Sequence, residues 1–591
     1  MHKLIDLHIH DGHNSSVLVI DHLTGDLLFG ANEERFTRQK NQGGFPYLAL
    51  KKSKEHLTFS SSDVKKIFFS TKTVPYFANQ KTSIFRKIFL QLNFHLPKSF
   101  FTNKLITKLY LKLSHKKRKK DLKKVLQKIG LSKAELCFFD HHFCHCASIL
   151  SFCNETNNKE LLLFTLDGSG DALSGSITVF KKNKFKILKQ IHTLDSLGEI
   201  YSQATALLNM KPMEHEYKLM GLAPYCKEEF AQKVKETIKG KLISLKLDKC
   251  GQYTFTSKTG KWGASLRKYM SKIFANYRFD AIAGGSQLFL EEEIVKWIKK
   301  WVKETGIRNI GLSGGVFMNV KVNMLISEMS EINSTTVVPS SGDESLVFGS
   351  WVLANFKNLK NNQSQQLKLN SGLNSGLLIG NTYDEKHLLV LIKKIKDKYQ
   401  NDIEVFEDNI NEKASILLSK GKIGARFSGR MEFGARSLGN RSIICSPHSI
   451  NQISLINEAI KSRDFWMPFA PVILDIDAIE YFKIDNNFKK NYQFMQIAAR
   501  STEKAQKNAP AILHPYDKTA RPQVLYKEIN PSFYELILKF KDISNIPCLL
   551  NTSFNLHGHP VVESPKQALD VFFKSGLDFL IFENYCISKT T

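Results

Sequence analysis

The sequence predicts an α/β protein of at least two domains. Its 591 residues are too many for one hydrophobic core. Apolar, strand-like runs lead into glycine-rich corners at residues 161–170 and 309–319, a pattern typical of doubly wound α/β folds. A segment rich in Asn, Gln, Ser and Lys follows these corners. We therefore predict an amino-terminal α/β domain over residues 1–355, a linker over 356–375 and a second α/β domain over 376–591.

The individual elements are predicted from alternating or continuous apolar patterns bounded by turn residues. In the first domain we expect strands at residues 4–9, 15–20, 26–29, 161–166, 309–313 and 335–338, with a helix at 140–148. In the second we expect an apolar run at 377–380, a helix at 384–399, a strand at 423–427 and a strand–turn–helix unit at 548–573.

The charge of the chain is strongly positive and unevenly distributed. There are 84 Lys and Arg against 56 Asp and Glu, a net charge of +28, which favours anionic ligands. Residues 101–130 hold eleven Lys or Arg and one acidic residue, Asp121. Leucines among them predict helices with one apolar stripe and a solvated basic face. We interpret residues 75–130 as a surface insertion, with binding of RNA or an acidic partner as the alternative.

Several features that would point to a membrane or secreted protein are missing from the sequence. No apolar run approaches the roughly 18 residues that cross a bilayer, and the amino terminus is too polar for a signal peptide. Nine cysteines without a Cys-x-x-Cys pair favour free thiols. We expect a cytoplasmic protein that neither inserts into membranes nor binds nucleic acid. The sequence is compatible with a homodimer.

Four side chains form a candidate metal site. His141 and His145 are four residues apart and would share one face of a helix. Asp167 ends an apolar strand beside glycines, and Asp343 lies in a similar corner after residues 335–338. Two imidazoles with one or two carboxylates suit ferrous iron, zinc or manganese and leave positions for a phosphate. A phosphoryl compound bound to a metal is the first functional interpretation.

Two alternatives to this site remain open. A histidine pair on a helix is more often a hydrogen-bonded structural feature than a ligand pair. A metallopeptidase of the His-Glu-x-x-His kind fits poorly, because His142 follows His141 where the general-base carboxylate would stand.

Candidate phosphate-binding residues occur in both domains. A strand runs into Gly314 and Gly315, followed by Asn319, and such corners offer backbone amides to phosphates. In the second domain Arg430, Arg436 and Arg441 lie within a short glycine-containing loop. Three guanidinium groups so close would repel one another without an anion, although Glu432 could neutralise one of them in a salt-bridge network.

Further cationic and hydroxyl side chains complete a predicted pocket for two phosphate-bearing ligands. No Gly-x-x-x-x-Gly-Lys-Ser/Thr loop is present, which disfavours ordinary P-loop chemistry. The additional residues are Lys461, Arg463, Arg521, Asn551, Thr552 and Ser553.

The chain resembles the NodU/CmcH/TobZ-type carbamoyltransferase family over nearly its whole length. The resemblance rests on residues 13–16, 33–38 with Lys40, the His141 and His145 pair, Asp167-Gly168, 196–201, 216–225, 313–319, 341–344 and the second-domain blocks described above.

The resemblance implies a duplicated actin/sugar-kinase-like (ASKHA) amino-terminal domain and a YrdC-like carboxyl-terminal domain. It implies that ATP, with Mg²⁺, and carbamoyl phosphate give carbamoyl-adenylate, whose carbamoyl group passes to a hydroxyl of a small molecule or saccharide. His141, His145, Asp167 and Asp343 would hold a divalent metal, with Fe²⁺ the expected ion. His13, Lys40 and Arg463 would be catalytic, with His13 as general base.

Two other functions share these features. A tRNA threonylcarbamoyladenosine-type modification enzyme has related domain types and would account for the positive charge. A nucleotide-sensing protein without turnover is the non-enzymatic alternative, which the complete set of His, Asp and Arg residues disfavours. The acceptor itself cannot be derived from the residue pattern.

Overall fold

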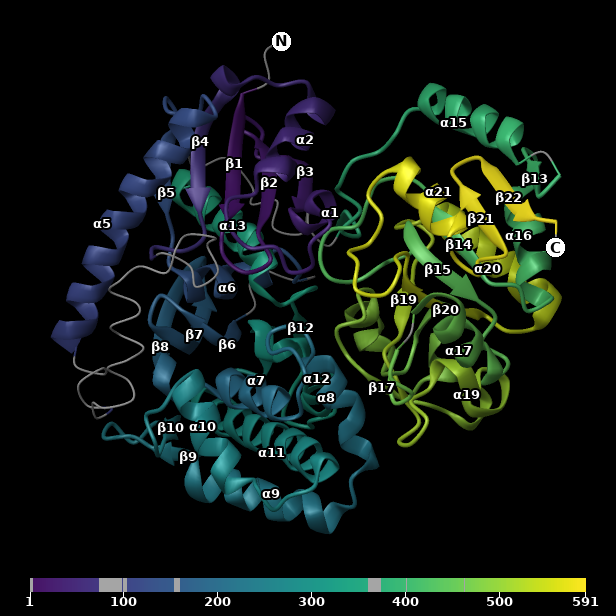
Figure 1. Cartoon of the computed structure of the whole chain (residues 1–591). Helices are drawn as coiled ribbons and strands as arrows, with labels where there is room; N and C mark the ends of the chain where they lie inside the picture. Colours follow the sequence, from purple (N-terminus) through teal and green to yellow (C-terminus); the bar gives the residue numbers. More distant parts are fainter. Residues whose placement is uncertain are drawn as a thin grey trace. The chain divides into compact units, whose positions relative to one another are not determined.

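The structure is a computed structural model that describes residues 4–73, 98, 104–153, 160–359, 374–399, 401–461 and 463–590. The chain forms two compact units (Figure 1). The first comprises Met1–Leu28, Asn41–Tyr47 and Thr58–Ser371, and the second comprises Phe29–Lys40, Leu48–Leu57 and Gly372–Thr591. Two short amino-terminal segments thus group with the carboxyl-terminal part of the chain.

Two five-stranded sheets repeat one topology. One has the order β3-β2-β1-β4-β5 and the other, taken from its far edge, β8-β7-β6-β11-β12. In each, the central strand pairs antiparallel with the next strand in sequence and parallel with the fourth, which pairs parallel with the fifth. The first unit therefore contains one sheet topology twice, which is a structural duplication. Its strands are β1 (Ile5–His10), β2 (Ser16–Asp21), β3 (Leu27–Asn32), β4 (Val64–Phe69), β5 (Glu135–Phe138), β6 (Leu161–Gly170), β7 (Leu173–Lys181), β8 (Lys184–His192), β11 (Asn309–Ser313) and β12 (Ser334–Val337).

Equivalent helices follow the last strand of each sheet. Helix α6 (His141–Leu150) follows β5, and α13 (Leu346–Leu359) follows β12 through the short 3₁₀ helix η5 (Asp343–Ser345). The two helices pack directly on each other, because a Cβ atom at Gly349 would lie only 1.8 Å from the carbonyl oxygen of Cys144. The amino-terminal ends of α6 and η5, at equivalent positions after the two sheets, hold His141 and Asp343.

The helices between β8 and β12 in sequence, with α11 the longest, pack on the second sheet and on one another. The long helix α11 buries Trp297 and Trp301 completely, and Trp297 packs edge-on against Phe164 of β6. Glycines on α11 admit α9, since a Cβ at Gly285 would lie 2.4 Å from Val234. These elements are α7 (Leu197–Leu207), α8 (Glu216–Leu222), α9 (Glu228–Lys241), α10 (Ala264–Ile273), α11 (Phe279–Thr305), α12 (Val320–Ser327), η4 (Gly315–Met318), β9 (Ile243–Leu247) and β10 (Tyr253–Ser257).

The basic insertion contains one long helix, α5 (Lys104–Lys128), while residues 74–97 and 99–103 lie outside the described residues. The predicted single apolar stripe is wrong. Leu122 and Leu126 are buried, whereas Leu109 and Leu113 are exposed. The apolar residues of α5 therefore lie on two different sides of the helix.

The second unit is built on an eight-stranded mixed sheet of order β13-β22-β21-β14-β15-β20-β16-β19. Its central strands are buried along their whole length, as in β14 and β15. The elements are α1 (Glu34–Thr37), α2 (Tyr47–Leu57), α15 (Glu385–Lys398), α16 (Ile410–Ser419), α17 (Asn451–Ile456), α18 (Ala478–Tyr481), α19 (Glu503–Asn508), α20 (Pro531–Ser544), α21 (Pro565–Phe573), β13 (Ile403–Phe406), β14 (Gly424–Phe427), β15 (Arg441–Cys445), β16 (Ala470–Leu474), β17 (Ala499–Arg500), β18 (Thr519–Ala520), β19 (Gln523–Leu525), β20 (Cys548–Ser553), β21 (Phe579–Phe582) and β22 (Tyr585–Lys589).

Most predicted elements are confirmed, including the strands of residues 4–29, the helix that begins at His141 and the strand–turn–helix unit near the carboxyl terminus. The apolar run at residues 377–380 contributes only an isolated bridge between Leu378 and Glu432. Residues 360–373 of the predicted linker lie outside the described residues, and residues 356–359 end α13. None of the described helices combines the length and apolar character that a bilayer crossing requires.

Candidate functional site

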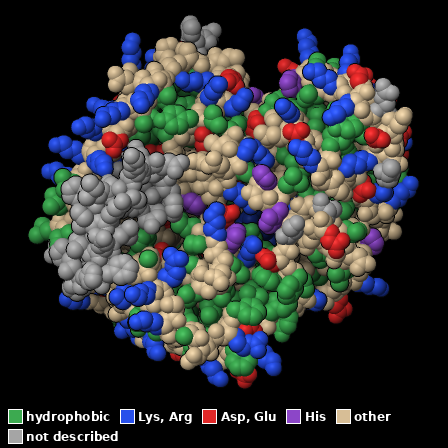
Figure 2. All heavy atoms as spheres, viewed as in Figure 1, with side chains coloured by type: hydrophobic (Ala, Val, Ile, Leu, Met, Phe, Trp, Pro, Cys, Tyr) green, Lys and Arg blue, Asp and Glu red, His purple; other side chains and the backbone are tan. Residues whose placement is uncertain are grey.

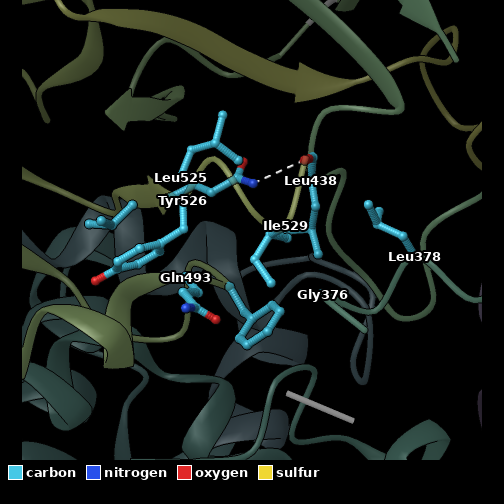
Figure 3. A pocket seen from close by; sticks show the side chains of 10 residues that line it. Gly376, Leu378, Leu438, Gln493, Leu525, Tyr526 and Ile529 are labelled. Carbon is cyan, nitrogen blue, oxygen red and sulfur yellow. Dashed lines mark hydrogen bonds between the residues drawn. The ribbon is translucent and has the colours of Figure 1, made fainter. Parts of the chain in front are cut away.

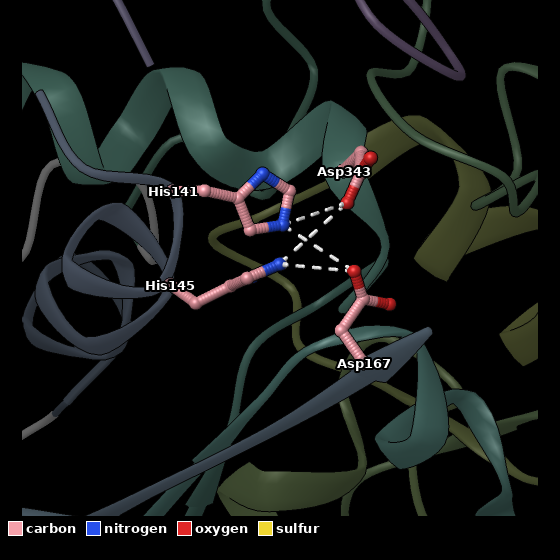
Figure 4. Close-up of side chains that lie close together, drawn as sticks. All are labelled: His141, His145, Asp167 and Asp343. Carbon is pink, nitrogen blue, oxygen red and sulfur yellow. Dashed lines mark hydrogen bonds and ion pairs between the residues drawn. The ribbon is translucent and has the colours of Figure 1, made fainter. Parts of the chain in front are cut away.

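Helix α6 presents two imidazoles over its first two turns. Asp140 caps the helix by accepting a hydrogen bond from the amide of Phe143, which fixes where the helix begins. His141 and His145 are one turn apart and only 3% and 0% exposed. Both Nε2 atoms point toward two carboxylates, Asp167 at the end of β6 and Asp343 at the start of η5 (Figure 4).

The four ligand atoms converge on one point. The Nε2 atom of His141 lies 3.3 Å from Asp167 Oδ2 and 3.5 Å from Asp343 Oδ1, and His145 Nε2 lies 4.0 and 3.6 Å from the same two oxygens. All four atoms are within 4.8 Å of one another. We call these four residues the metal cluster.

The metal cluster fits a divalent cation. Among the described residues, His145 Nε2 and Asp343 Oδ1 are buried polar atoms without a hydrogen-bond partner, although each faces the other. Two nitrogen and two carboxylate oxygen donors suit a borderline first-row ion such as Fe²⁺, Zn²⁺ or Mn²⁺. A cation between these atoms would satisfy both of them.

Surrounding groups hold the ligands in place. Ser313 Oγ lies 3.1 Å from His145 Nδ1, so the Nε2 atom remains available to a cation. The amide of Gly315 donates to Asp167 Oδ1 at 3.1 Å, and Asp171 accepts the backbone amide of His141 at 2.9 Å. These bonds hold His145, Asp167 and the backbone of His141 in place before any ion binds.

Opposite charges within the metal cluster shift the pKa values of its histidine and aspartate side chains. Burial lowers the pKa of His141, but Asp343 and Asp167 outweigh it and raise that pKa to about 9. Burial raises the pKa of Asp343, but His141 and His10 bring it well below the usual range. A cation would replace the proton that His141 carries, so cation binding should release protons.

Two histidines near the metal cluster come from the amino-terminal strand and the turn that follows it. His10 is 1% exposed, and its Nε2 atom lies 3.6 Å from Asp343 Oδ2. His13 bonds the backbone of Met213, and its pKa is lowered by burial while Asp343 and Asp167 oppose this. Predicted residue His13 therefore lies beside the cluster, and His10 is a neighbour that sequence reasoning missed. Its only signal was a second histidine before Asp11-Gly12.

Gly170 is packed against a ligand and offers a specific test. A Cβ atom at Gly170 would lie 2.2 Å from the Cγ and Cδ2 atoms of His141, whereas a Cβ at Gly168 would meet nothing within 4 Å. We expect Gly170→Ala to displace the imidazole and weaken metal binding roughly 10- to 100-fold. Chelator competition measures the affinity. Gly168→Ala is the control, and equal affinities in the two variants would contradict this geometry.

The predicted phosphate corner lies against the metal cluster. Gly314 has a φ of 104°, and a Cβ there would lie 2.2 Å from the carbonyl oxygen of Leu166, so only glycine fits. Gly315 contacts Asp167 as described. Asn319 instead exchanges hydrogen bonds with the buried side chain of Gln287.

Glu199 is a buried acid near the same corner that sequence reasoning did not single out as a site residue. It is 8% exposed and accepts hydrogen bonds from the Gly263 amide and Gln203. The adjacent Ser196 donates to the carbonyl of Asp167 at 3.0 Å. Burial raises the pKa of Glu199 to about 7.

This shift predicts a pH-dependent stability. The folded state holds the proton of Glu199 more tightly than the unfolded chain does. The protonated Glu199 therefore contributes its full stabilisation below about pH 4.5, and this contribution is lost as pH rises through about 7. The free energy of unfolding of Glu199→Gln should therefore exceed that of the unmodified protein by up to about 3 kcal/mol above pH 7, and by little near pH 4.5. Denaturant unfolding across this range checks it, with exposed Glu304→Gln as control. A gain independent of pH would contradict the assignment.

The second unit brings five predicted cations together. The positive charges of Arg463 and Lys40 act on Lys461, and those of Arg436 and Arg463 act on Arg521. Burial first, and then these neighbours, hold the pKa values of Lys461 and Arg521 well below their usual ranges. We call Lys40, Arg436, Lys461, Arg463 and Arg521 the cationic cluster. Such a concentration of positive charge would favour a bound anion.

The end of β20 orients this cationic cluster. Arg463 Nη2 donates to Thr552 Oγ1 at 3.0 Å, and Lys461 Nζ donates to the carbonyls of Ser553 and Asn555 at 2.5 and 3.0 Å. Lys461 therefore also fixes the turn that follows β20. Asn551 bonds Gln523 and the carbonyl of Ser437, which holds the arginine-containing loop.

The other two loop arginines bind the backbone. Arg430 donates to the carbonyls of Gly380 and Ile379, and Arg441 donates to those of Ser428 and Gly429. Arg441 is fully buried, with its guanidinium 3.7 Å from the ring centroid of Phe427. The structure therefore places only Arg436 of the three in the cationic cluster. Glu432 accepts backbone amides of the same loop, including Asn440 at 2.8 Å.

A small pocket lies elsewhere in the second unit (Figure 3). Its wall combines apolar side chains, such as Leu438, Phe494 and Ile529, with the polar side chains of Gln493 and Gln523. Gln523 closes one side by donating to the Leu438 carbonyl at 3.0 Å. None of the predicted site residues lines it.

Two family models together match most of the chain. Residues 5–352 match the family model for the carbamoyltransferase N-terminus, and residues 415–589 match that for the carbamoyltransferase C-terminus. An uncharacterized protein of Methanocaldococcus jannaschii is 32% identical over 99% of both chains. Nodulation protein NolNO of Sinorhizobium fredii is 27% identical over 99% of this chain and 79% of its own. Among solved structures, HypF of T. kodakarensis aligns with a TM-score of 0.30 and 13% identity, covering 61% of this chain and 49% of HypF.

Proposed function

The chain belongs to the carbamoyltransferase family, and we propose that it is an ATP-dependent O-carbamoyltransferase working through carbamoyl-adenylate. The observation that carries the proposal is the pairing, in one chain, of a metal-type cluster with a separate cationic cluster. The duplicated sheets of the first unit support an actin/sugar-kinase-like (ASKHA) class for it, and we propose a YrdC-like class for the second unit.

The cationic cluster would form the activated intermediate. ATP, carried with Mg²⁺, and carbamoyl phosphate together bring many negative charges, and Arg436, Arg463 and Arg521 would neutralise them as the leaving groups depart. The products would be carbamoyl-adenylate, pyrophosphate from ATP and phosphate from carbamoyl phosphate, with one water consumed. Lys40 would contribute a further positive charge.

The metal cluster would serve the transfer step. His141, His145, Asp167 and Asp343 would hold a divalent ion, with Fe²⁺ as the expected one, and the ion would supply positive charge to a bound phosphate. His13, beside this cluster, would accept the proton of the acceptor hydroxyl as it attacks the carbamoyl carbon, and AMP would leave. The proposed acceptor is a hydroxyl of a saccharide or another small molecule.

Pyrophosphate release tests the proposal. The protein supplied with ATP, Mg²⁺ and carbamoyl phosphate should release pyrophosphate, and omission of carbamoyl phosphate should stop the release. Mass spectrometry of cell extracts with and without the protein should then reveal a metabolite that gains one carbamoyl group. Metal-loaded protein that releases no pyrophosphate would contradict the adenylate mechanism.

A further inference from the structure

The basic helix α5 takes no part in the proposed chemistry, yet one of its faces is firmly fixed. Arg118 is 2% exposed, with its guanidinium donating to Asp11 Oδ1 at 2.5 Å and to the carbonyl of Thr73 at 2.8 Å. Leu122 and Leu126 continue this buried row at intervals of four residues. The inner face of α5 is thus anchored to the first unit, which defines an outer face.

The outer face is apolar in its first half. Leu109 and Leu113 precede Arg118 and Leu122 by nine residues, which is two and a half helical turns, so they lie on the opposite side. Their side chains are 59% and 55% exposed. Leucines kept in water at adjacent turns of a helix forgo the stabilisation that burial would provide.

The outer face is basic in its second half. Lys116, Lys120 and Lys124 each precede an inner-face residue by two positions, about 200° around the helix, and all three are exposed. They continue a row of lysines at every fourth residue that includes Lys108 and Lys112. Like charges at this spacing destabilise a helix.

The surrounding sequence does not neutralise this charge. No Asp or Glu occurs between Asp63 and Asp121. Within the described part of the chain, no ion pair involves the exposed lysines of α5. Figure 2 shows Lys and Arg side chains along the edge of the first unit where α5 runs in Figure 1.

We propose that the outer face of α5 docks on an anionic lipid bilayer surface. Leu109 and Leu113 enter the boundary between headgroups and acyl chains, and Lys116, Lys120 and Lys124 lie on the anionic headgroups. The leucines favour lipid over RNA, since RNA rewards stacking side chains and arginine rather than aliphatic ones. Docking on the bilayer, without crossing it, would bring the enzyme to acceptors at the membrane surface.

Vesicle binding tests this docking. The full-length protein is mixed with vesicles of phosphatidylcholine and phosphatidylglycerol in equal amounts, or of phosphatidylcholine alone, and bound protein is measured by flotation. We expect binding to the anionic vesicles only, weakening as salt is raised. The Lys116→Gln, Lys120→Gln, Lys124→Gln triple variant should bind roughly 100-fold more weakly, and the Leu109→Gln, Leu113→Gln variant about 10-fold or more.

A charge-matched control isolates α5 from net charge. The control triple variant carries Lys268→Gln, Lys272→Gln and Lys303→Gln, all exposed positions on α10 and α11. It should bind anionic vesicles nearly as well as the unmodified protein, and all variants should keep pyrophosphate release. Absent vesicle binding, or equal losses in both triple variants, would overturn the proposal. So would RNA that binds α5 more tightly than vesicles and tolerates the leucine changes, which would assign the face to nucleic acid.

Discussion

We expect His145→Ala to abolish the proposed metal binding and carbamoyl transfer, and to continue to release pyrophosphate. His145 is fully buried, and its Nε2 atom faces Asp343 Oδ1 at 3.6 Å. Removing one of four ligands leaves the two carboxylates poorly neutralised. We expect metal content to fall from about one ion per chain to near zero and transfer to fall by at least about 100-fold. Elemental analysis and product mass spectrometry measure the two effects.

The same helix supplies the matched control. His142 is also buried, and its Nδ1 atom lies 3.0 Å from Thr165 Oγ1, outside the metal cluster. His142→Ala removes the same volume from α6 but should retain the metal. Loss of metal from both variants would show that packing rather than ligation is responsible. Retention of metal by His145→Ala would contradict the metal cluster itself.

The metal cluster could be predicted because local rules place its members. A four-residue spacing on a helix brings His141 and His145 to one face, and carboxylates at strand ends collect at one edge of a sheet. The structure confirms that Asp167 and Asp343 meet the histidines. The neighbour His10 was not predictable, since its position depends on the pairing of β1 with β4 across 60 residues.

The duplication follows from the family resemblance, and the residue pattern by itself gives no sign of it. The two sheets share strand order, but the quoted motifs share little beyond Asp11-Gly12 and Asp167-Gly168. Nor did the sequence distinguish Arg118 from the lysines around it, although it alone among them is buried against Asp11. Long-range packing decides these features, and one sequence contains no direct signal of it.

The arginine loop shows the limit of charge counting. The sequence predicts that the three guanidinium groups share an anion, but Arg430 and Arg441 instead donate hydrogen bonds to backbone carbonyls. Arg436 lies instead with Arg521 and Arg463, which are distant in sequence. The fold keeps Arg430 and Arg441 apart from other cations by pairing them with backbone carbonyls, whereas Arg436 lies beside cations from distant parts of the sequence.

Arg521→Met is therefore expected to stabilise the protein and to disable it. Arg521 lies among like charges, and its Nε atom has no hydrogen-bond partner among the described residues. Methionine keeps much of the side-chain volume and removes the repulsion, so the free energy of unfolding should rise by on the order of 1 kcal/mol. Pyrophosphate release should fall roughly 100-fold or more, because the developing phosphate charge loses a donor.

Ligand-dependent unfolding separates this effect from ordinary stabilisation. ATP should raise the unfolding midpoint of the unmodified protein more than that of Arg521→Met, because a ligand stabilises in proportion to its affinity. Exposed Lys527→Met removes one charge from the same segment and should change neither activity nor the response to ATP. A variant that is less stable than the unmodified protein would mean that an interaction with Arg521 outweighs the repulsion. The cationic cluster would then be a structural network, and the anion site would have to lie elsewhere.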